Sequence, residues 1–343
     1  MPPTIRVLMI TSEWPTAGQP RTTHFIKRQA DFLRAAGVDV DVFHFKGRKN
    51  PFNYLRAWIE TQRKLARQDY DLVHAQFGQS GLLALPKRFP LVVTFRGNDL
   101  LGIVGDRNGR YTYLGRIAQK ASRLVASSAD RVIVVSEEMK SYLPSSVSAQ
   151  VIPSGIDFDL FRCLPQDEAR RTLGLPLDER LVLFVGRPSE TRKRFDISER
   201  AVEILNQSLP SKLIVAWGVD HTDIPIYMNA CDVLVFTSML EGSPNVVKEA
   251  LACNLPVVSV PVGDVALRIG GIEGCELCAD DCPETVAAAL ELVLRRGQRI
   301  AGRDKVTNLD EKIITRQVIG VYQSILATRQ RLNLSELAVP TNT

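Results

Sequence analysis

The fold is decided by residues 233–260, VLVFTSMLEGSPNVVKEALACNLPVVSV, which contain one complete strand–helix–strand unit. Val233–Phe236 and Pro256–Val260 are short and nearly all apolar, as strands covered on both faces of a sheet are. Pro244–Cys253 lies between them and predicts a helix. Two strands joined by a helix in this way lie parallel, with a right-handed crossover.

The same alternation of apolar strands and helical stretches extends along the whole chain. Further strands are predicted at Ile5–Ile10, Val38–Phe43, Leu72–Ala75, Leu91–Phe95, Arg131–Val135, Gln150–Ile152, Leu181–Val185 and Leu213–Ala216, and further helices at Thr23–Ala36, Phe195–Ser208 and Glu284–Leu294. The series stops near Ile152 and restarts at Leu181, after a stretch that contains Pro165, Gly174 and Pro176. We therefore predict an α/β protein with two doubly wound, Rossmann-like domains that face a cleft.

We expect four parts along the chain. They are a first domain over residues 1–160, a second domain over 161–308, a helix over 309–330 that packs back on the first domain, and a flexible tail over 331–343. The predicted helix Leu309–Leu326 carries one apolar stripe for burial, made of Ile313, Ile314, Val318, Val321, Tyr322 and Ile325. The polar composition after Arg331 indicates a loosely held tail.

Composition limits the class of protein and its partners. Hydrophobic residues make up 45% of the 343 residues and charged residues 24%, which is typical of a folded globular protein. The net charge of +5 is too small for a nucleic-acid-binding surface and suits a protein that handles anionic small molecules. We find neither a signal-peptide pattern nor an apolar run near the roughly 20 residues of a membrane span, so we expect a cytoplasmic protein whose six cysteines are reduced.

The loop and helix inside the opening segment carry groups suited to a phosphorylated sugar. Gly242 allows a ligand close to the backbone, and Ser243 and Pro244 are favourable as N-cap and first helical residue. The helix start then offers free amides to a phosphate or hydroxyl. Glu249, further along, can accept paired hydrogen bonds from hydroxyl groups such as those of a ribose. The alternative is that Glu249 and its neighbour Lys248 form the solvent face of the helix and that the preceding loop carboxylate is only a surface charge.

A second group of charges follows the strand Leu181–Val185. The sequence VGRPSETRKRFD over residues 185–196 places four cations, Arg187, Arg192, Lys193 and Arg194, directly after a glycine. Arginine forks and lysine point charges both suit a diphosphate leaving group. We expect Arg187 and Lys193 to bind it and Arg192 and Arg194 to be largely solvated. The alternative is an ordinary solvated basic loop.

Taken together, these motifs resemble the retaining glycosyltransferases of family 4. The shared features are Gly-Arg, then Lys-x-Phe-Asp, then two glutamates eight positions apart around a Glu-Gly-x-Pro loop. Thr94–Asp99, Ala129–Ser136 and Val151–Asp157 look like the family's middle landmarks, so the likeness covers most of the chain. It is nearest to enzymes of the bacterial surface-polysaccharide and teichuronic-acid type. The resemblance implies the glycosyltransferase-B fold.

The resemblance also implies roles for individual residues. Arg187 and Lys193 would hold the donor diphosphate, Glu241 would contact the donor sugar, and Glu249 would bind the ribose hydroxyls. The remaining donor contacts would come from Gly186, Gly242, Ser243, Pro244, Asn245 and Val246. The implied reaction moves a sugar from a nucleotide diphosphate sugar to a saccharide or lipid-linked acceptor, with retention of configuration, in cell-surface polysaccharide synthesis. It needs no metal and no cofactor, because the protein's own cations supply the positive charge.

The sequence departs from the family pattern in several places. Arg96 replaces a histidine near the sugar and cannot act as a base, which leaves Asp99 as a polar candidate in the cleft. Gly18 occupies the place of the family's glycine-rich loop, where an ordinary turn is the alternative. Arg194 replaces a glycine. The second domain is shortened after Ala216, which removes the usual place for nucleobase contacts.

Three further features of the sequence bear on function. His24 and His74 favour structural roles over catalytic ones. Cys275, Cys278 and Cys282 could bind a metal, but a closed zinc site needs four ligands, so we predict none. Basic and aromatic residues on Asn53–Arg67 suit an anionic membrane surface at the inner face, although such a helix more often covers a sheet. The rival functions are a nucleotide-sugar epimerase of the same architecture and an inactive homologue that only binds nucleotide sugars.

Overall fold

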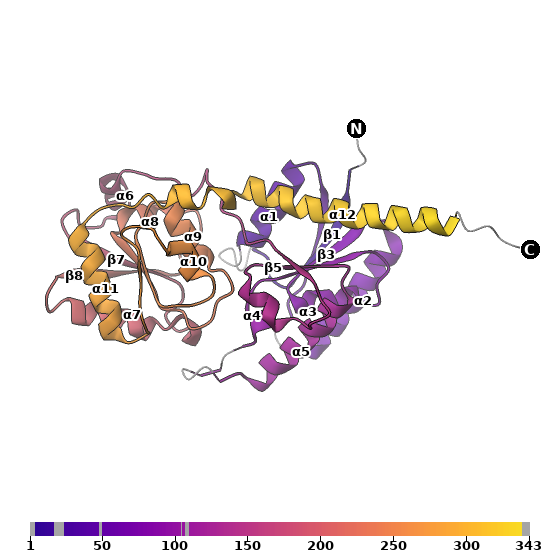
Figure 1. The fold of residues 1–343 in the computed structure, drawn as a ribbon, viewed down its shortest axis with the longest axis horizontal. Helices are drawn as coiled ribbons and strands as arrows, with labels where there is room; N and C mark the ends of the chain where they lie inside the picture. The colour runs from indigo at the N-terminus through magenta and orange to yellow at the C-terminus, as the bar shows by residue number, and fades with distance from the viewer. Residues whose placement is uncertain (1–3, 17–23, 48–49, 104, 107–109, 338–343) are drawn as a thin grey trace, which may run out of the picture.

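The computed structural model describes residues 4–16, 24–47, 50–103, 105–106 and 110–337, and for 332–337 the backbone only. It contains two parallel sheets, one from each half of the chain, and each is flanked by helices (Figure 1). This confirms the predicted fold class of two doubly wound α/β domains.

The first sheet has the strand order β2-β1-β3-β4-β5-β6, and every pairing is parallel. Its strands are β1 Arg6–Thr11, β2 Asp39–His44, β3 Leu72–Gln76, β4 Leu91–Phe95, β5 Arg131–Val134 and β6 Ala149–Val151. Its helices are α1 His24–Ala35, α2 Pro51–Arg67, α3 Gly78–Gly81, α4 Asn98–Leu101 and α5 Tyr113–Ser128. The order reverses between β1 and β3, which makes the carboxyl ends of these strands the expected ligand side.

Alternate residues of each strand in the first sheet pack on opposite faces. Val7 and Met9 of β1 contact the layer formed by α1 and the C-terminal helix, whereas Leu8 and Ile10 contact the layer formed by α2 and α5. Burial on both faces explains why these strands are apolar without interruption.

The second sheet has the order β11-β10-β9-β7-β8 and is also parallel. Its strands are β7 Arg180–Val185, β8 Ser211–Ala216, β9 Val233–Phe236, β10 Val257–Ser259 and β11 Glu276–Leu277. Its helices are α6 Gln166–Leu173, α7 Phe195–Leu205, α8 Ile224–Ala230, α9 Asn245–Ala252, α10 Val265–Ile269 and α11 Pro283–Arg296. Residues 217–223 connect β8 directly to α8 with no helix or strand between them, as predicted for the stretch after Ala216.

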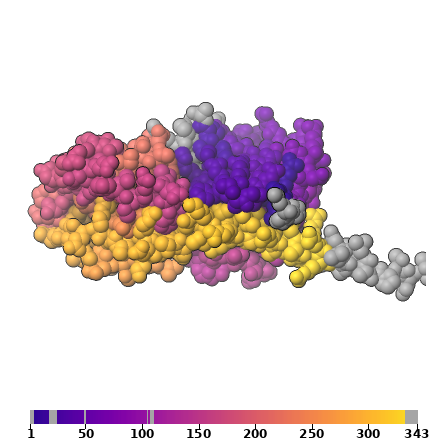
Figure 2. Space-filling view, turned by 90° about the horizontal axis from the view of Figure 1, so that it is seen from above, coloured from indigo at the N-terminus to yellow at the C-terminus, as the bar shows by residue number. Residues whose placement is uncertain are grey.

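The last helix, α12 Glu311–Leu337, begins beside the second domain and lies across the first (Figure 1). Seen from above, the C-terminal segment forms one band against both halves of the molecule (Figure 2). Tyr322 is fully buried and its hydroxyl lies 2.7 Å from His74 Nδ1 of β3. Ile314, Val318, Val321 and Ile325 are also buried.

Two details of α12 differ from the sequence prediction. Ile313, predicted in the buried stripe, is exposed, whereas its neighbour Ile314 is buried. Adjacent residues of a helix point about 100° apart, so the two do not lie on the same face. The helix also continues to Leu337, beyond the residue after which a loose tail was predicted.

Candidate functional site

Cations that follow β7 converge on Glu241, which follows β9. Lys193 Nζ lies 2.7 Å and Arg192 Nη1 lies 2.5 Å from the same oxygen, Glu241 Oε1. Because β7 and β9 are neighbours in the sheet, the loops at their carboxyl ends meet, although some 48 residues separate them in sequence.

Backbone contacts fix these two loops against each other. The Thr237 hydroxyl is within hydrogen-bond distance of the carbonyls of Lys193 and Arg194, at 3.1 and 3.0 Å. The Met239 amide donates to the Arg192 carbonyl at 2.8 Å. Hydrogen bonds from the loop after β9 therefore fix the backbone that carries Arg192 and Lys193, so these cations are positioned before any ligand binds.

Glu241 is ionised in this arrangement. Burial by itself would raise the pKa of its carboxyl group, but the charges of Lys193 and Arg192 and their hydrogen bonds outweigh it and hold the pKa below its ordinary value. The loop thus presents a carboxylate whose charge is compensated by Lys193 and Arg192.

The prediction that Arg192 and Arg194 are largely solvated is wrong. Arg192 bonds to Glu190 at 2.6 Å as well as to Glu241, and Arg194 is ion-paired with Asp281. Sequence reasoning treated them as a charge run, whereas the fold brings each a carboxylate from another loop.

Arg187 lies at the end of β7 beside an exposed aromatic ring. Its guanidinium carbon is 4.6 Å from the centroid of Trp217, which follows β8 and is 49% exposed. The contact follows from register, since Val185 of β7 is level with Ala216 of β8, and Gly186 donates to the Ala216 carbonyl at 3.3 Å. Arg187 is therefore oriented by an aromatic ring while its charge faces solvent.

Gly242 lies tightly against the first domain. A Cβ atom there would lie 2.8 Å from Met139 Sδ and 3.0 Å from the Arg96 carbonyl oxygen, both in the first domain. A larger residue would displace the Met139 side chain and crowd the Arg96 carbonyl, so glycine lets the Glu241 loop pack against the first domain.

The helix start after Gly242 differs by one residue from the prediction. Pro244 occupies the cap position and α9 begins at Asn245, whereas the Ser243 hydroxyl donates to Asp264 Oδ2 at 2.8 Å. The Asn245 side-chain oxygen is buried and has no hydrogen-bond partner among the residues that the structure describes, and Val246 is partly buried against the core. Ser243 therefore anchors the loop to its neighbour instead of capping the helix.

Glu249 and Lys248 are both buried, so the alternative that they form a solvent face is wrong. Lys248 Nζ donates to the Ser154 carbonyl at 3.0 Å, and burial lowers the pKa of this ammonium group to about 7. Glu249 is 6% exposed. Burial would raise its pKa, but His221 and the nearby charges of Arg28 and Lys248 hold it below the ordinary value.

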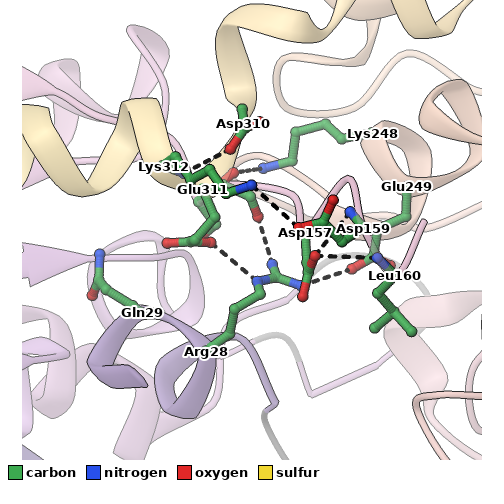
Figure 3. A network of polar contacts seen from close by, with 12 residues as sticks. Arg28, Gln29, Asp157, Asp159, Leu160, Lys248, Glu249, Asp310, Glu311 and Lys312 are labelled. Atoms are coloured by element: carbon green, nitrogen blue, oxygen red, sulfur yellow. Dashed lines mark hydrogen bonds and ion pairs between the residues drawn. The ribbon is translucent and has the colours of Figure 1, made fainter. Parts of the chain in front are cut away.

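Sequence reasoning missed Arg28 and His221, which flank Glu249. Arg28 Nη1 of α1 and His221 Nε2 of the β8–α8 loop each lie 3.7 Å from Glu249 Oε1. Figure 3 shows Arg28 between Glu249 and Glu311 of α12. A cation inside the buried stripe of α1 was a signal for Arg28, but no local pattern marks His221.

Arg96 joins the first domain to the segment that links the domains. Its guanidinium donates to Gln76 Oε1, Gln29 Oε1 and, at 2.6 Å, to Ser154 Oγ. Burial lowers its pKa to about 10, so it stays charged at neutral pH. The residue that replaces the family's histidine is engaged in a structural network.

Asp99 and His74 are also engaged in the fold. The Asp99 carboxylate accepts the amides of Arg96, Gly97 and Gly78, and its burial raises the pKa to about 6. His74 is fully buried between Tyr322 and Thr94, and burial lowers its pKa to about 3, which agrees with the structural role that the sequence favoured. Gly18 lies outside the described residues.

The three clustered cysteines have separate surroundings. Cys275 Sγ accepts the Val257 amide at 3.4 Å, Cys278 is buried and Cys282 is exposed. In the part of the chain that the structure describes, no group of three or more His, Cys, Asp or Glu side chains is arranged to hold a metal ion. Within the same residues, no helix combines the length and apolar character needed to cross a bilayer.

Two family patterns match the two halves of the chain. Residues 5–160 match "Glycosyltransferase Family 4" and residues 179–296 match "Glycosyl transferases group 1". The two matches fall on the two parallel-sheet domains.

Individual relatives agree with these patterns. A Bacillus subtilis protein named as a teichuronic acid biosynthesis glycosyltransferase, TuaC, is 29% identical over 78% of this chain and 83% of its own length. A D-inositol 3-phosphate glycosyltransferase of Mycobacterium tuberculosis is 30% identical over 76% of this chain. The match covers 64% of that relative, which is less than two thirds of its length.

Solved structures share the fold at low sequence identity. Sucrose-phosphate synthase from Thermosynechococcus elongatus superposes with a TM-score of 0.77 at 20% identity, over 94% of this chain and 100% of its own. Anabaena HepE in complex with UDP-glucose superposes with a TM-score of 0.66 at 18% identity, over 93% of this chain and 100% of its own.

Proposed function

The chain belongs to the glycosyltransferases of family 4 and group 1, and from that premise we propose that it transfers a sugar from a nucleotide diphosphate sugar to a hydroxyl group, with retention of configuration. One observation carries the proposal: Arg192, Lys193 and Glu241 converge at the carboxyl ends of β7 and β9, with Arg187 on the same edge. Ligands of doubly wound sheets bind at this edge.

The diphosphate is bound by Arg187 and Lys193 in this proposal. Lys193 is already oriented by Glu241, and Arg187 presents a solvent-facing guanidinium fixed against Trp217. Arg192 compensates the charge of Glu241, so Lys193 can turn part of its hydrogen bonding toward a phosphate without leaving the carboxylate unpaired. Glu241 then accepts hydrogen bonds from the donor sugar.

The chemical step follows from that charge distribution. The bond between the anomeric carbon and the diphosphate oxygen breaks, and the acceptor hydroxyl oxygen bonds to the same face of that carbon. The acceptor proton passes to an oxygen of the leaving diphosphate, which needs no protein base. Arg187 and Lys193 stabilise the charge that grows on the diphosphate, so the proposed mechanism uses no metal and no cofactor.

We propose a saccharide or lipid-linked acceptor and a place in surface-polysaccharide synthesis. The support is the similarity to a relative named for teichuronic acid biosynthesis. Phe52 and Leu55 of α2 are 79% and 54% exposed. Arg63 lines the same groove, together with Arg56, which is ion-paired with Glu60, and exposed apolar residues beside a cation suit peripheral contact with the anionic inner face of the membrane. The other face of α2 buries Ala57 and Leu65 against the sheet.

The experiment is an activity panel on the full chain. UDP-, GDP- and ADP-sugars are incubated with and without saccharide acceptors, and nucleotide release and sugar transfer are measured. Nucleotide release with transfer is the expected result. Interconversion of the sugar without release would indicate the epimerase, and binding without turnover would indicate an inactive homologue.

A further inference from the structure

A cavity of about 350 Å³ opens at the edge of the first sheet where its strands begin. Its lining includes Phe89 and Pro90, which lead into β4, Asp130 and Arg131 at the start of β5, and Ile325 of α12. Because the strands are parallel, this amino edge lies opposite their carboxyl ends. Three segments far apart in the sequence therefore border a space that is separate from the site described above.

Positive charge is in excess around this cavity. Its lining contains one carboxylate, Asp130, and four cations, Lys87, Arg88, Arg131 and Arg329. The two Asp130 oxygens lie 3.0 and 3.1 Å from Lys87 Nζ, and Arg131 Nη1 donates to the Asp130 carbonyl at 2.8 Å. Among the residues that the structure describes, Arg88 and Arg329 have no ion-pair partner. The arginines therefore keep unused N–H donors that suit an anionic ligand.

A second cavity, of about 680 Å³, adjoins the first, since Asp130 and Arg131 line both. The only other charged side chains in its lining are Glu137 and Lys140, which pair with each other at 2.7 Å. The rest of its polar lining consists of neutral hydroxyl and amide side chains without a hydrogen-bond partner in the described part of the chain: Ser127, Ser146, Ser148 and Gln150. The combined space thus has a cationic end and a neutral, polar end.

We propose that the two cavities together hold an acidic saccharide chain, at a site apart from the place of sugar transfer. Acidic groups of the chain bind among Arg88, Arg131 and Arg329, because a guanidinium fork matches a carboxylate or a phosphate. Sugar hydroxyls exchange hydrogen bonds with the serine hydroxyls and the Gln150 amide. A small inorganic anion would match the charges but would leave the larger cavity empty. The proposal rests on the function proposed above and specifies the acceptor as an acidic polymer.

The position of the two cavities determines what they contribute to the reaction. β4 has five residues, which at about 3.3 Å each separate the two edges of the first sheet by about 16 Å. A chain bound at the amino edge is therefore held at a distance from its reacting hydroxyl. Such a contact keeps a long acceptor on the enzyme between additions and gives no advantage to a short one.

The test is calorimetric titration of the full chain with hexagalacturonate and with maltohexaose, a neutral chain of the same length. The titrations are done at low ionic strength, because salt screens exposed charges. The wild type should bind hexagalacturonate and give no binding heat with maltohexaose. The double variant Arg88→Ala with Arg329→Ala should bind hexagalacturonate at least tenfold more weakly, the scale of a charged hydrogen bond.

A second double variant tests the neutral end of the site. Ser148→Ala with Gln150→Ala should weaken hexagalacturonate binding by about fivefold, since two neutral hydrogen bonds are lost. The matched control is Arg316→Ala, which removes an exposed cation of α12 outside both cavities and should keep the wild-type affinity. All substituted side chains are exposed, so thermal unfolding should show wild-type stability.

The outcomes separate this inference from the proposed function. Absence of hexagalacturonate binding, or equal binding of maltohexaose, would overturn the acidic saccharide site. An arginine variant with wild-type affinity would place the binding elsewhere, and a loss in the arginine variant alone would indicate a site for small anions. Release of nucleotide from the nucleotide-sugar panel should be unchanged in both double variants. A wild type that binds hexagalacturonate but turns over no nucleotide sugar would instead refute the proposed function.

Discussion

Lys193 Nζ lies 2.7 Å from Glu241 Oε1, so the lysine assigned to the donor diphosphate is already held in place by the carboxylate assigned to the donor sugar. A cation fixed before the reaction stabilises developing charge without the cost of reorganisation.

Removal of either assigned cation should lower turnover more than it weakens donor binding. Arg187→Ala and Lys193→Ala should each reduce kcat by about a hundredfold or more, the scale for one preorganised stabiliser, with a smaller rise in the apparent donor KM. Arg187→Lys should rescue only in part, because the guanidinium fork and its stacking on Trp217 are lost. Steady-state kinetics on folded variants measure this.

The control for this experiment is Arg194→Ala, since Arg194 pairs with Asp281 away from Glu241. Arg192 cannot serve as a control, because it shares the Glu241 oxygen with Lys193. If Arg194→Ala lowers kcat as much as Lys193→Ala does, the segment is an undifferentiated basic loop and the assignment of catalytic charges is wrong.

Glu249→Ala should weaken binding of the nucleotide sugar by about 2–4 kcal/mol, because a buried charged acceptor of hydroxyl hydrogen bonds is lost. Calorimetric titration with the cognate donor measures the change. Glu276→Ala, an acidic residue in β11 outside the network of Glu249, is the control and should leave the affinity unchanged. Unchanged affinity in Glu249→Ala would rule out the ribose role.

Activity should persist in excess chelator, because Arg187 and Lys193 supply positive charge at the diphosphate. The measurement is turnover with EDTA, followed by addition of magnesium or manganese, together with elemental analysis of the purified protein. Loss of activity with rescue by either ion would reveal a carboxylate metal site. Stoichiometric zinc would instead point to Cys275 and Cys278.

The buried His74 should make stability depend on pH in a defined window. Its pKa is about 3 in the folded protein and 6.5 when free, so the unfolded chain binds a proton that the folded chain does not. Its contribution is complete above pH 6.5 and is lost as the pH falls toward 3. Over that window, His74→Gln should flatten the pH dependence of the unfolding free energy by up to about 1.4 kcal/mol per pH unit.

Denaturant unfolding at several pH values tests this prediction. Tyr322→Phe removes the hydroxyl that contacts His74 Nδ1 but leaves the imidazole buried, so it should lower stability and keep the wild-type slope. Parallel curves for the wild type and His74→Gln would contradict the prediction.

The sheets were predictable because their strands are buried on both faces, and such strands appear in the sequence as unbroken apolar runs. α10 and β11 were not predicted. β11 is only Glu276–Leu277, too short for an apolar run, and α10, Val265–Ile269, is shorter than two helical turns and so shows no helical period. Ile313 was wrongly assigned to the buried face because the apolar spacing shows that one side of the helix is buried but does not fix the edges of that side.

The sequence predicted which loops form the site but not which side chains pair with one another in it. The resemblance marked Lys193, Glu241 and Glu249 by position. The pairing of Arg192 with Glu241 joins residues 49 positions apart, and the contact of Arg28 with Glu311 joins residues 283 positions apart. Local pattern carries no information about such pairs, because tertiary packing alone decides them.

The course of α12 limits how the two halves can be recombined. Tyr322 and its neighbours on α12 pack in the core of the first domain, yet they follow the whole second domain in the sequence. A chimera that exchanges the second domain with that of another transferase must therefore splice in an internal segment and keep residues from Glu311 onward with the original first domain. A fusion partner joined after Leu337 would extend from the end of α12, the helix that lies across the first domain.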